Sequence, residues 1–460
     1  TINITADALS AKTGVLQLVP AEKDLKEVLV TSKKPLIERK LDRTIVNVDA
    51  SITNTGSTAL EVLEKSPGIS VDKDGNISLK GKAGVIVYLD GRPSYLSGPD
   101  LANMLRNMTA SQLEQIEIMT NPPAKYDAAG NAGVINIKTK KNKMFGYNGN
   151  ITTGYTQGRY ARFNEAVSFN YRNKKVNFFS SFNYNRNHRR QELYIVRNFR
   201  DAATKNIKSI FDQQTTMINQ NHNYSAKAGI DYTVSKNTTI GFVLNGFYNP
   251  SLWESNTKTY IYDPNYNLTG ITTASTENKE KWKNFSSNVN FRTKLDTAGQ
   301  ELSADLDFIQ YKATSMQPLT SSYFDNMGNL KQAPDVLYGT LPTNIKIYSG
   351  KVDYILPLKK DARFEAGFKT SFVTNDNDAR YDSLKTGYAV LDSARSNHFI
   401  YDENINAAYV NYNRPLGKKW SAQLGLRVEN TNSNGISKGY TFSTAEDRFV
   451  YTETKFKRSY

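Results

Sequence analysis

Apolar and polar residues alternate with a period of two over most of the chain after Tyr147. In one such stretch Val167, Phe169 and Tyr171 alternate with Ser168 and Asn170. The alternation recurs in segments of about ten residues, at 176–185, 224–234, 240–248, 285–295, 302–310, 364–372 and 420–428. A period of two predicts β-strands with one apolar and one polar face, and about ten residues suffice for a tilted strand to cross a bilayer.

The connections between these segments alternate between short and long. Short polar connections stand at 173–175, 235–237, 296–300, 358–361 and 416–419, whereas long polar segments stand at 188–221, 250–280, 313–343, 375–400 and 431–452. Outer-membrane β-barrels have short periplasmic turns and long extracellular loops. The pattern therefore predicts a large antiparallel transmembrane barrel, of which we count about eleven strands, with the long segments as surface loops.

Residues 41–110 have a different pattern, which predicts a compact α/β unit. Thr58 and Glu61 form a candidate capping box for a helix that stops at Pro67 and Gly68. The largely apolar run 85–89 predicts a strand that is covered on both faces, and a second apolar helical face begins at Pro99.

The stretch 113–140 joins the two kinds of sequence. Its pattern predicts two strands, with Pro122 and Pro123 ending the first and Asn136 interrupting the apolar run of the second. The loop between them consists largely of alanine and glycine, which suits backbone pressed against a wall. From the pattern alone, an ordinary hairpin is an equal alternative.

Composition narrows the function classes. The chain of 460 residues has no cysteine and only three scattered histidines, so we expect no disulfide, no metal centre and no cofactor. We also find no catalytic constellation, and we expect no enzyme activity. The net charge of +15 would suggest nucleic acid in a soluble protein, but the basic residues are scattered and no nucleic-acid motif is present. The mean hydropathy of −0.57 and the lack of an 18-residue apolar run exclude a transmembrane helix, but not a transmembrane barrel.

Three motifs in order carry a family resemblance. They are SPGISVDKDGNISLKG (66–81), VIVYLDGRP (85–93) and IEI followed by PAKYDAAGNAGVINI (116–118 and 123–137). Together they resemble the plug domain of TonB-dependent outer-membrane transporters of Gram-negative bacteria. The resemblance implies an α/β plug in the lumen of a barrel with roughly twenty-two strands, so we expect the natural protein to continue beyond Tyr460.

The resemblance also implies a division of the chain into four parts. Residues 1–20 are similar to the end of a carboxypeptidase-regulatory-like β-sandwich, 21–40 form a linker, 41–142 the plug and 143–460 the partial barrel. Because the chain opens at Thr1 without a signal peptide, we expect a processed or truncated chain. Within the linker, one run resembles the TonB box, which a periplasmic TonB-type energy-coupling protein captures: Leu25, Lys26, Glu27, Val28, Leu29, Val30 and Thr31. β-Augmentation suits such a run, and a linker strand paired to the sandwich is the alternative.

Further site residues follow from the resemblance. Lys80, Asp90 and Arg92 are expected at the interface between plug and barrel, although Lys80 stands where many plugs have arginine and lacks its bidentate fork. The plug motif itself consists of Pro67, Gly68, Gly81, Gly91, Gly130, Gly133 and Asn136. Aromatic residues in the predicted loops either bind solute or pack the loops, and packing is the favoured interpretation: Trp253, Tyr260, Tyr262, Tyr266, Tyr323 and Phe324.

The function that the resemblance implies is energy-coupled import of a scarce solute, such as a siderophore, vitamin, glycan or peptide, across the outer membrane. The expected partners are the energy-coupling protein, membrane lipid and the solute, and the resemblance also allows a surface lipoprotein lid. One rival is a binding or adhesion barrel that does not transport. The other is a soluble β-protein that binds polyanions, which accounts for neither the connection pattern nor the three motifs.

Overall fold

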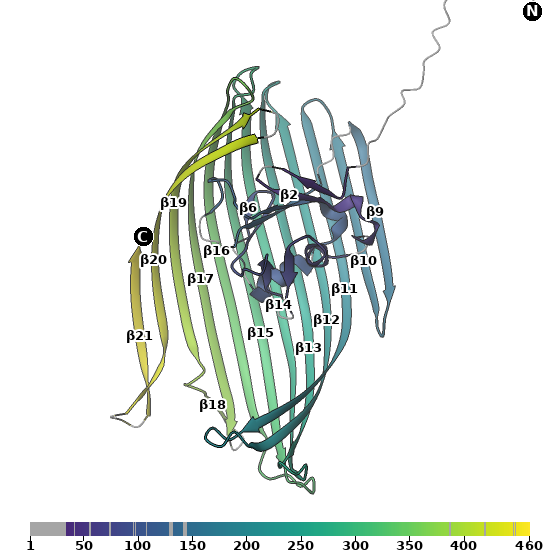
Figure 1. Ribbon diagram of the computed structural model, residues 1–460, viewed down its shortest axis with the longest axis vertical. Helices are drawn as coiled ribbons and strands as arrows, with labels where there is room; N and C mark the ends of the chain where they lie inside the picture. The colour runs from purple at the N-terminus through teal and green to yellow at the C-terminus, as the bar shows by residue number, and fades with distance from the viewer. Residues whose placement is uncertain are drawn as a thin grey trace, which may run out of the picture.

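The computed structural model describes residues 34–460, with gaps at 41, 55–56, 73–74, 95, 97, 107, 128–131, 141–144, 386–387, 418–419, 445 and 447. The described chain forms two parts, which we call the inner unit (34–140) and the wide sheet (146–459). Figure 1 shows the inner unit against the concave side of the curved wide sheet. No helix in the described residues is long and apolar enough to cross a membrane.

The inner unit is built on a six-stranded sheet with two α-helices. The strand order is β1 (Ile37–Arg39), β2 (Thr44–Asn47), β7 (Leu113–Met119), β8 (Val134–Thr139), β5 (Ile86–Leu89) and β6 (Arg92–Pro93), and the β5–β8 pair is parallel. A separate hairpin joins β3 (Ile69–Val71) to β4 (Ile77–Leu79). The helices are α1 (Ala59–Glu64) and α2 (Gly98–Arg106), and short 3-10 turns lie at Val48–Ala50, Ile52–Asn54 and Ala110–Gln112.

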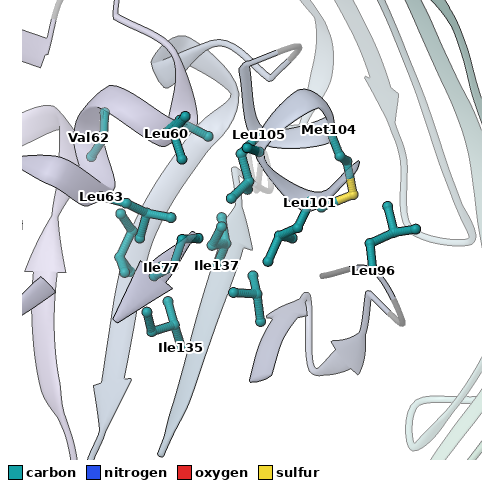
Figure 2. Close-up of a cluster of buried hydrophobic side chains, with 14 of the residues drawn as sticks. Leu60, Val62, Leu63, Ile77, Leu96, Leu101, Met104, Leu105, Ile135 and Ile137 are labelled. Atoms are coloured by element: carbon teal, nitrogen blue, oxygen red, sulfur yellow. The ribbon is translucent and has the colours of Figure 1, made fainter. Parts of the chain in front are cut away.

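Local sequence signals explain why these elements form. The capping box that starts α1 is present, because Thr58 accepts from the Glu61 backbone while the Glu61 carboxylate accepts from the Thr58 N–H. Strand β5 is covered on both faces, since its successive residues Val87 and Tyr88 are both buried. Figure 2 shows side chains of α1, α2, β4 and β8 meeting in one apolar cluster, in which Leu63, Leu105 and Ile137 are fully buried.

The wide sheet contains thirteen antiparallel strands, of which twelve follow one another along the sheet in chain order. They are β9 (Gly146–Gln157), β10 (Ala161–Arg172), β11 (Val176–Arg200), β12 (Ile207–Thr233), β13 (Thr238–Tyr262), β14 (Leu268–Lys294), β15 (Glu301–Phe324), β16 (Asp335–Pro357), β17 (Arg363–Lys385), β19 (Asn397–Leu416), β20 (Trp420–Ser443) and β21 (Arg448–Ser459). The short β18 (Tyr388–Leu391) pairs with β17 beside this path. Among the described residues, β9 and β21 form the two open edges of the sheet.

The strands are much longer than the sequence predicted, and this corrects the expected long loops. From β11 to β17 each strand has 23–27 residues. The polar segments predicted as loops, such as 188–221 and 250–280, are mostly continuous paired strands that turn at 201–206 and 263–267. Backbone hydrogen bonds hold a hairpin together whether or not its side chains are apolar, so the loss of the apolar face did not end the strands.

The two faces of the wide sheet meet different surroundings. Val167 and Phe169, on the face away from the inner unit, are 48% and 41% exposed. On the concave face, side chains of β14, β15 and β16 join the buried cluster of the inner unit: Trp282, Tyr311, Ala313, Ile345 and Ile347. The sheet therefore offers an exposed apolar outer face and an inner face that is covered in part by the inner unit.

Candidate functional site at the interface of inner unit and wide sheet

The turn that follows β5 is fixed rigidly to β8. The Asp90 N–H donates to the Ile137 carbonyl (2.8 Å), and the Asp90 carboxylate accepts from the N–H and hydroxyl of Thr139 (2.9 and 2.7 Å). The next N–H, of Gly91, donates to Oδ1 of Asn136 (2.9 Å). Asp90 and Gly91 both have positive φ, 52° and 85°, so the chain reverses sharply here. The turn is thereby positioned to direct Arg92 away from the inner unit.

Arg92 bridges two carboxylates of strand β15. Its Nη2 lies 2.9 Å from Asp305 Oδ1, and its Nε lies 3.1 Å from Asp307 Oδ1. Asn288 of β14 donates to Asp307 (2.8 Å) and holds that carboxylate in place. Two charge-assisted hydrogen bonds from one planar guanidinium fix orientation as well as distance.

Asp90 itself also faces the wide sheet. The ammonium of Lys227 on β12 lies 3.7 Å from Asp90 Oδ2 and donates to the Thr139 hydroxyl (3.3 Å). The same Lys227 lies over the ring of Phe179 (5.9 Å to the centroid). This contact is longer than the two contacts of Arg92, so we assign it less of the attachment.

Asp127 makes the most deeply buried charged contact between the two parts. Its carboxylate accepts from Lys369 Nζ of β17 (2.6 Å) and from Arg427 Nη2 of β20 (3.0 Å). The side chains of Asp127, Lys369 and Arg427 are only 14%, 7% and 8% exposed. Burial disfavours the charged carboxylate, but the ammonium of Lys369 and then the guanidinium of Arg427 outweigh burial and lower the pKa of Asp127.

The segment that carries Asp127 is fixed from both sides. The Asp127 N–H donates to Tyr88 Oη (2.9 Å), and Tyr88 packs edge-on against Tyr126 (5.1 Å between centroids). Burial raises the pKa of Tyr126 to about 12, so its phenol stays neutral. On the other side Arg427 also pairs with Glu429 (2.6 Å), which completes the neutralisation of the guanidinium. One acid of the inner unit is thus held by two cations on separate strands of the wide sheet.

A second buried acid organises the inner unit behind this interface. Glu117 of β7 is 2% exposed, accepts from Asn136 Nδ2 (2.7 Å) and pairs with Arg43 (3.1 Å) and Lys138 (3.0 Å). Burial disfavours its charge, but the Asn136 hydrogen bond and Arg43 outweigh burial and lower the pKa of Glu117. Asn136 therefore links Glu117 to the Gly91 turn, and its interruption of the apolar strand has this structural reason.

Apolar contact completes the interface. Tyr311 of β15 is 5% exposed, packs near Trp282 and Phe247, and donates to the Ser94 carbonyl of the inner unit (3.4 Å). Among the described residues, the interface thus combines an apolar contact area with the two ion-pair groups around Arg92 and Asp127. The longer contacts of Asp90 with Lys227 (3.7 Å) and of Glu61 with Arg189 (3.4 Å) add to them.

The remaining residues singled out from the sequence have varied surroundings. Lys80 is exposed at φ 50° and makes no ion pair with a described residue. Of the plug-motif glycines, Gly68, Gly81, Gly91 and Gly133 have positive φ. Gly130 and the candidate TonB box at 25–31 lie outside the described residues.

The six aromatic candidates for solute binding are not in loops as expected, except one. Trp253, Tyr260 and Tyr262 lie in β13 and Tyr323 and Phe324 in β15, whereas Tyr266 lies in the turn 263–267. Trp253 and Tyr260 are an odd number of residues apart in one strand, so they point to opposite faces of the sheet. The six therefore do not line one common surface, because most of them lie in strands, where successive side chains point to opposite faces.

Sequence reasoning did not identify Asp127, Lys369, Arg427 or Glu117. Asp127 stands inside the quoted motif PAKYDAAG, but nothing in the sequence shows which strands face it. Lys369 and Arg427 occupy alternate positions opposite the apolar face of β17 and β20, where a lumen-facing cation is the ordinary expectation. A charged residue inside an otherwise small, apolar loop is the signal that could have singled out Asp127.

Part of the wide sheet matches a known protein family. Residues 293–456, 164 of the 460, match the model described as the outer membrane protein beta-barrel family. This stretch includes β15 to β20 and therefore carries Asp305, Asp307, Lys369 and Arg427. No protein with a curated description matches this chain.

Several solved structures match this chain at low sequence identity. The ferric enterobactin receptor PfeA is 8% identical with a TM-score of 0.38, and the similarity covers 91% of each chain. The ferric yersiniabactin uptake receptor FyuA of Yersinia pestis is 12% identical with a TM-score of 0.40, covering 91% of this chain and 72% of that one. FpvA of P. aeruginosa, bound to pyoverdines, is 11% identical with a TM-score of 0.37, covering 92% and 71%.

The family match and the exposed apolar outer face of the long strands together define a class. The protein is an outer-membrane protein of the β-barrel type.

Proposed function

We propose that this protein is a TonB-dependent transporter that imports a small solute across the outer membrane, with the inner unit as its plug. The observation that carries the proposal is the attachment of the inner unit to the concave face of the wide sheet. Two groups of ion pairs make this attachment: Asp127 with Lys369 and Arg427, and Arg92 with Asp305 and Asp307. A unit that lies against the lumen-facing side of a barrel wall obstructs passage, so transport requires that it move.

The interface combines features that favour and oppose such a movement. Water can solvate the charged groups around Arg92 and Asp127 when the interface opens, whereas the apolar contact around Tyr311 becomes exposed and holds the inner unit in place. Strand β5 connects the two ion-pair groups, because its Tyr88 accepts from the Asp127 N–H and the turn that follows it leads to Arg92. Force applied to the chain ahead of β1 would therefore reach both groups through the same element.

The run 25–31 is our candidate for the point where that force is applied. It is β-prone and flanked by charged residues, so an energy-coupling protein can capture it through main-chain hydrogen bonds. The residues Lys80, Asp90 and Arg92 and the glycines of the motif are proposed to serve the plug that this force rearranges.

Replacing Val28 by proline tests the proposal. Proline removes a backbone N–H and should abolish strand capture, whereas Val28→Ile keeps the backbone and the β-branched side chain. We expect Val28→Pro to retain surface binding of the nutrient whose limitation induces the protein but to lose its uptake, with Val28→Ile unchanged in both. Uptake that survives in Val28→Pro would favour the alternative, a barrel that binds without transporting.

A further inference from the structure

Four lysines form a basic patch on the outer face of the wide sheet, which we call the lysine patch. They are Lys281 and Lys283 of β14, Lys312 of β15 and Lys346 of β16, and all four are exposed. The three strands are consecutive neighbours, so the patch is compact: Lys283 lies directly opposite Lys312, and Lys346 is opposite Gln310.

Strand alternation fixes the direction of these side chains. Trp282 lies between Lys281 and Lys283, Tyr311 and Ala313 flank Lys312, and Ile345 and Ile347 flank Lys346. All five flanking residues belong to the buried cluster beneath the inner unit. Because successive side chains of a strand point to opposite faces, the four lysines point away from the inner unit, to the membrane side.

The charges of the patch are not neutralised by the protein. None of the four lysines forms an ion pair with a described residue. Apart from the Lys283–Lys312 pair, their cross-strand partners on the outer face carry no charge: Tyr248, Pro250, Gln310, Thr314, Asn344 and Thr374. The acids on the neighbouring strands of that face have other partners, since Asp376 of β17 contacts His398 (2.7 Å) and Asp402 of β19 accepts from Thr374 (2.7 Å). Like charges directly opposite in a sheet are destabilising, so Lys283 and Lys312 repel each other unless an anion lies between them.

The position of the patch indicates which anion this is. On the side of the short turns, the outer face continues with exposed apolar residues, such as Phe285 and Val289 on β14 and Tyr348 and Val352 on β16. On the other side the strands extend past the patch toward the long hairpins, and Lys279 is paired with Glu277 (2.8 Å). The lysines thus lie where the apolar belt ends on the extracellular side, which is the level of the lipid headgroups of the outer leaflet.

We propose that the lysine patch binds the phosphate groups of anionic lipid headgroups in the outer leaflet of the outer membrane. The apolar residues beside the patch contact the acyl chains while the ammonium groups hold the phosphates. Tyr248, whose ring lies 5.5 Å from Lys283 Nζ, stands at the boundary between these two contacts.

The experiment measures lipid retention by the full protein purified in a neutral detergent. Native mass spectrometry follows binding of bisphosphorylated lipid A to the wild type and to the variant K281Q/K283Q/K312Q/K346Q. A control, K205Q/K208Q/K258Q/K331Q, removes the same charge from exposed lysines nearer the hairpin tips. We expect the patch variant to bind about tenfold more weakly or worse, and the control to bind as the wild type does.

Two further measurements make the result unambiguous. Without lipid, the patch variant should melt at the same temperature as the wild type or higher, because the repulsion between Lys283 and Lys312 is removed. Added lipid A should raise the melting temperature of the wild type and the control but not that of the patch variant. Equal lipid retention in all three proteins would overturn the proposal, and so would inorganic phosphate that matches the effect of lipid A at equal concentration.

Discussion

At the scale of single residues, the inner unit depends on backbone positions that only glycine fills well. Gly133 has φ 118°, and a Cβ there would lie 2.4 Å from the Met119 carbonyl oxygen, whereas Gly81 has φ 76° and no atom within 4 Å of its Cβ position. Both glycines belong to the motif in the sequence, but only the structure distinguishes them. Gly81 needs the positive φ alone, whereas Gly133 also needs the absence of a side chain. Gly133 lies where β8 begins, directly beside the end of β7.

The two glycines make a matched pair for a stability test. We expect Gly81→Ala to cost about 1 kcal/mol through backbone strain alone. Gly133→Ala should cost several times as much, because the clash with Met119 adds to the strain. Urea titration measures both losses of stability. Detachment of the inner unit is followed by the fluorescence of Trp282 in variants that lack the other two tryptophans. Equal costs would contradict the steric role of Gly133.

At the scale of elements, the Asp127 segment is the contact of the inner unit with β17 and β20. Its lowered pKa means that Asp127 holds its proton more weakly in the folded protein than in the unfolded chain, where the value is about 3.9. The stabilisation is therefore complete above about pH 4 and is lost as the pH falls through the lower folded pKa.

Asp127→Asn should remove this contribution. Near neutral pH we expect a loss of about 3 kcal/mol in the attachment of the inner unit, because Lys369 and Arg427 keep buried charge without their partner. The loss should shrink as the wild type is acidified below pH 4. The control Asp49→Asn breaks the exposed pair with Lys140 and should cost less than about 1 kcal/mol. The same Trp282 titration applies, and a pH-independent difference between wild type and Asp127→Asn would contradict the assignment.

Some helices, strands and turns could be predicted from the sequence, and others could not. The capping box of α1, the doubly covered strand β5 and the short turns at 173–175 and 235–237 follow from local signals, and the structure has them. The length of β11 to β17 could not be predicted from the sequence. Beyond the membrane the strands are largely polar on both faces, so their composition resembles that of a loop. Arg92 and Asp90 were expected at the interface, whereas Lys369 and Arg427 could not be matched to Asp127, since the pairing spans 242 and 300 residues.

At the scale of the whole molecule, the proposed import requires that the inner unit move relative to a fixed wide sheet. A covalent link between the two parts can test this, because the chain has no cysteine of its own. A Cβ on Gly425 of β20 would lie 2.9 Å from the Ala124 Cβ, slightly closer than the two Cβ atoms of a disulfide, so a small shift would accommodate the bond. Ala124 and Gly425 lie close in sequence to Asp127 and Arg427, so the disulfide would link the two parts at this ion-pair group.

The decisive measurement is uptake by cells that carry Ala124→Cys/Gly425→Cys, with the single-cysteine variants as controls and the nutrient whose limitation induces the protein as the solute. We predict that the oxidised double variant binds this solute at the surface but does not import it, and that dithiothreitol restores import to the level of the single variants. Import at the normal rate while gel analysis shows the disulfide fully formed would contradict the account.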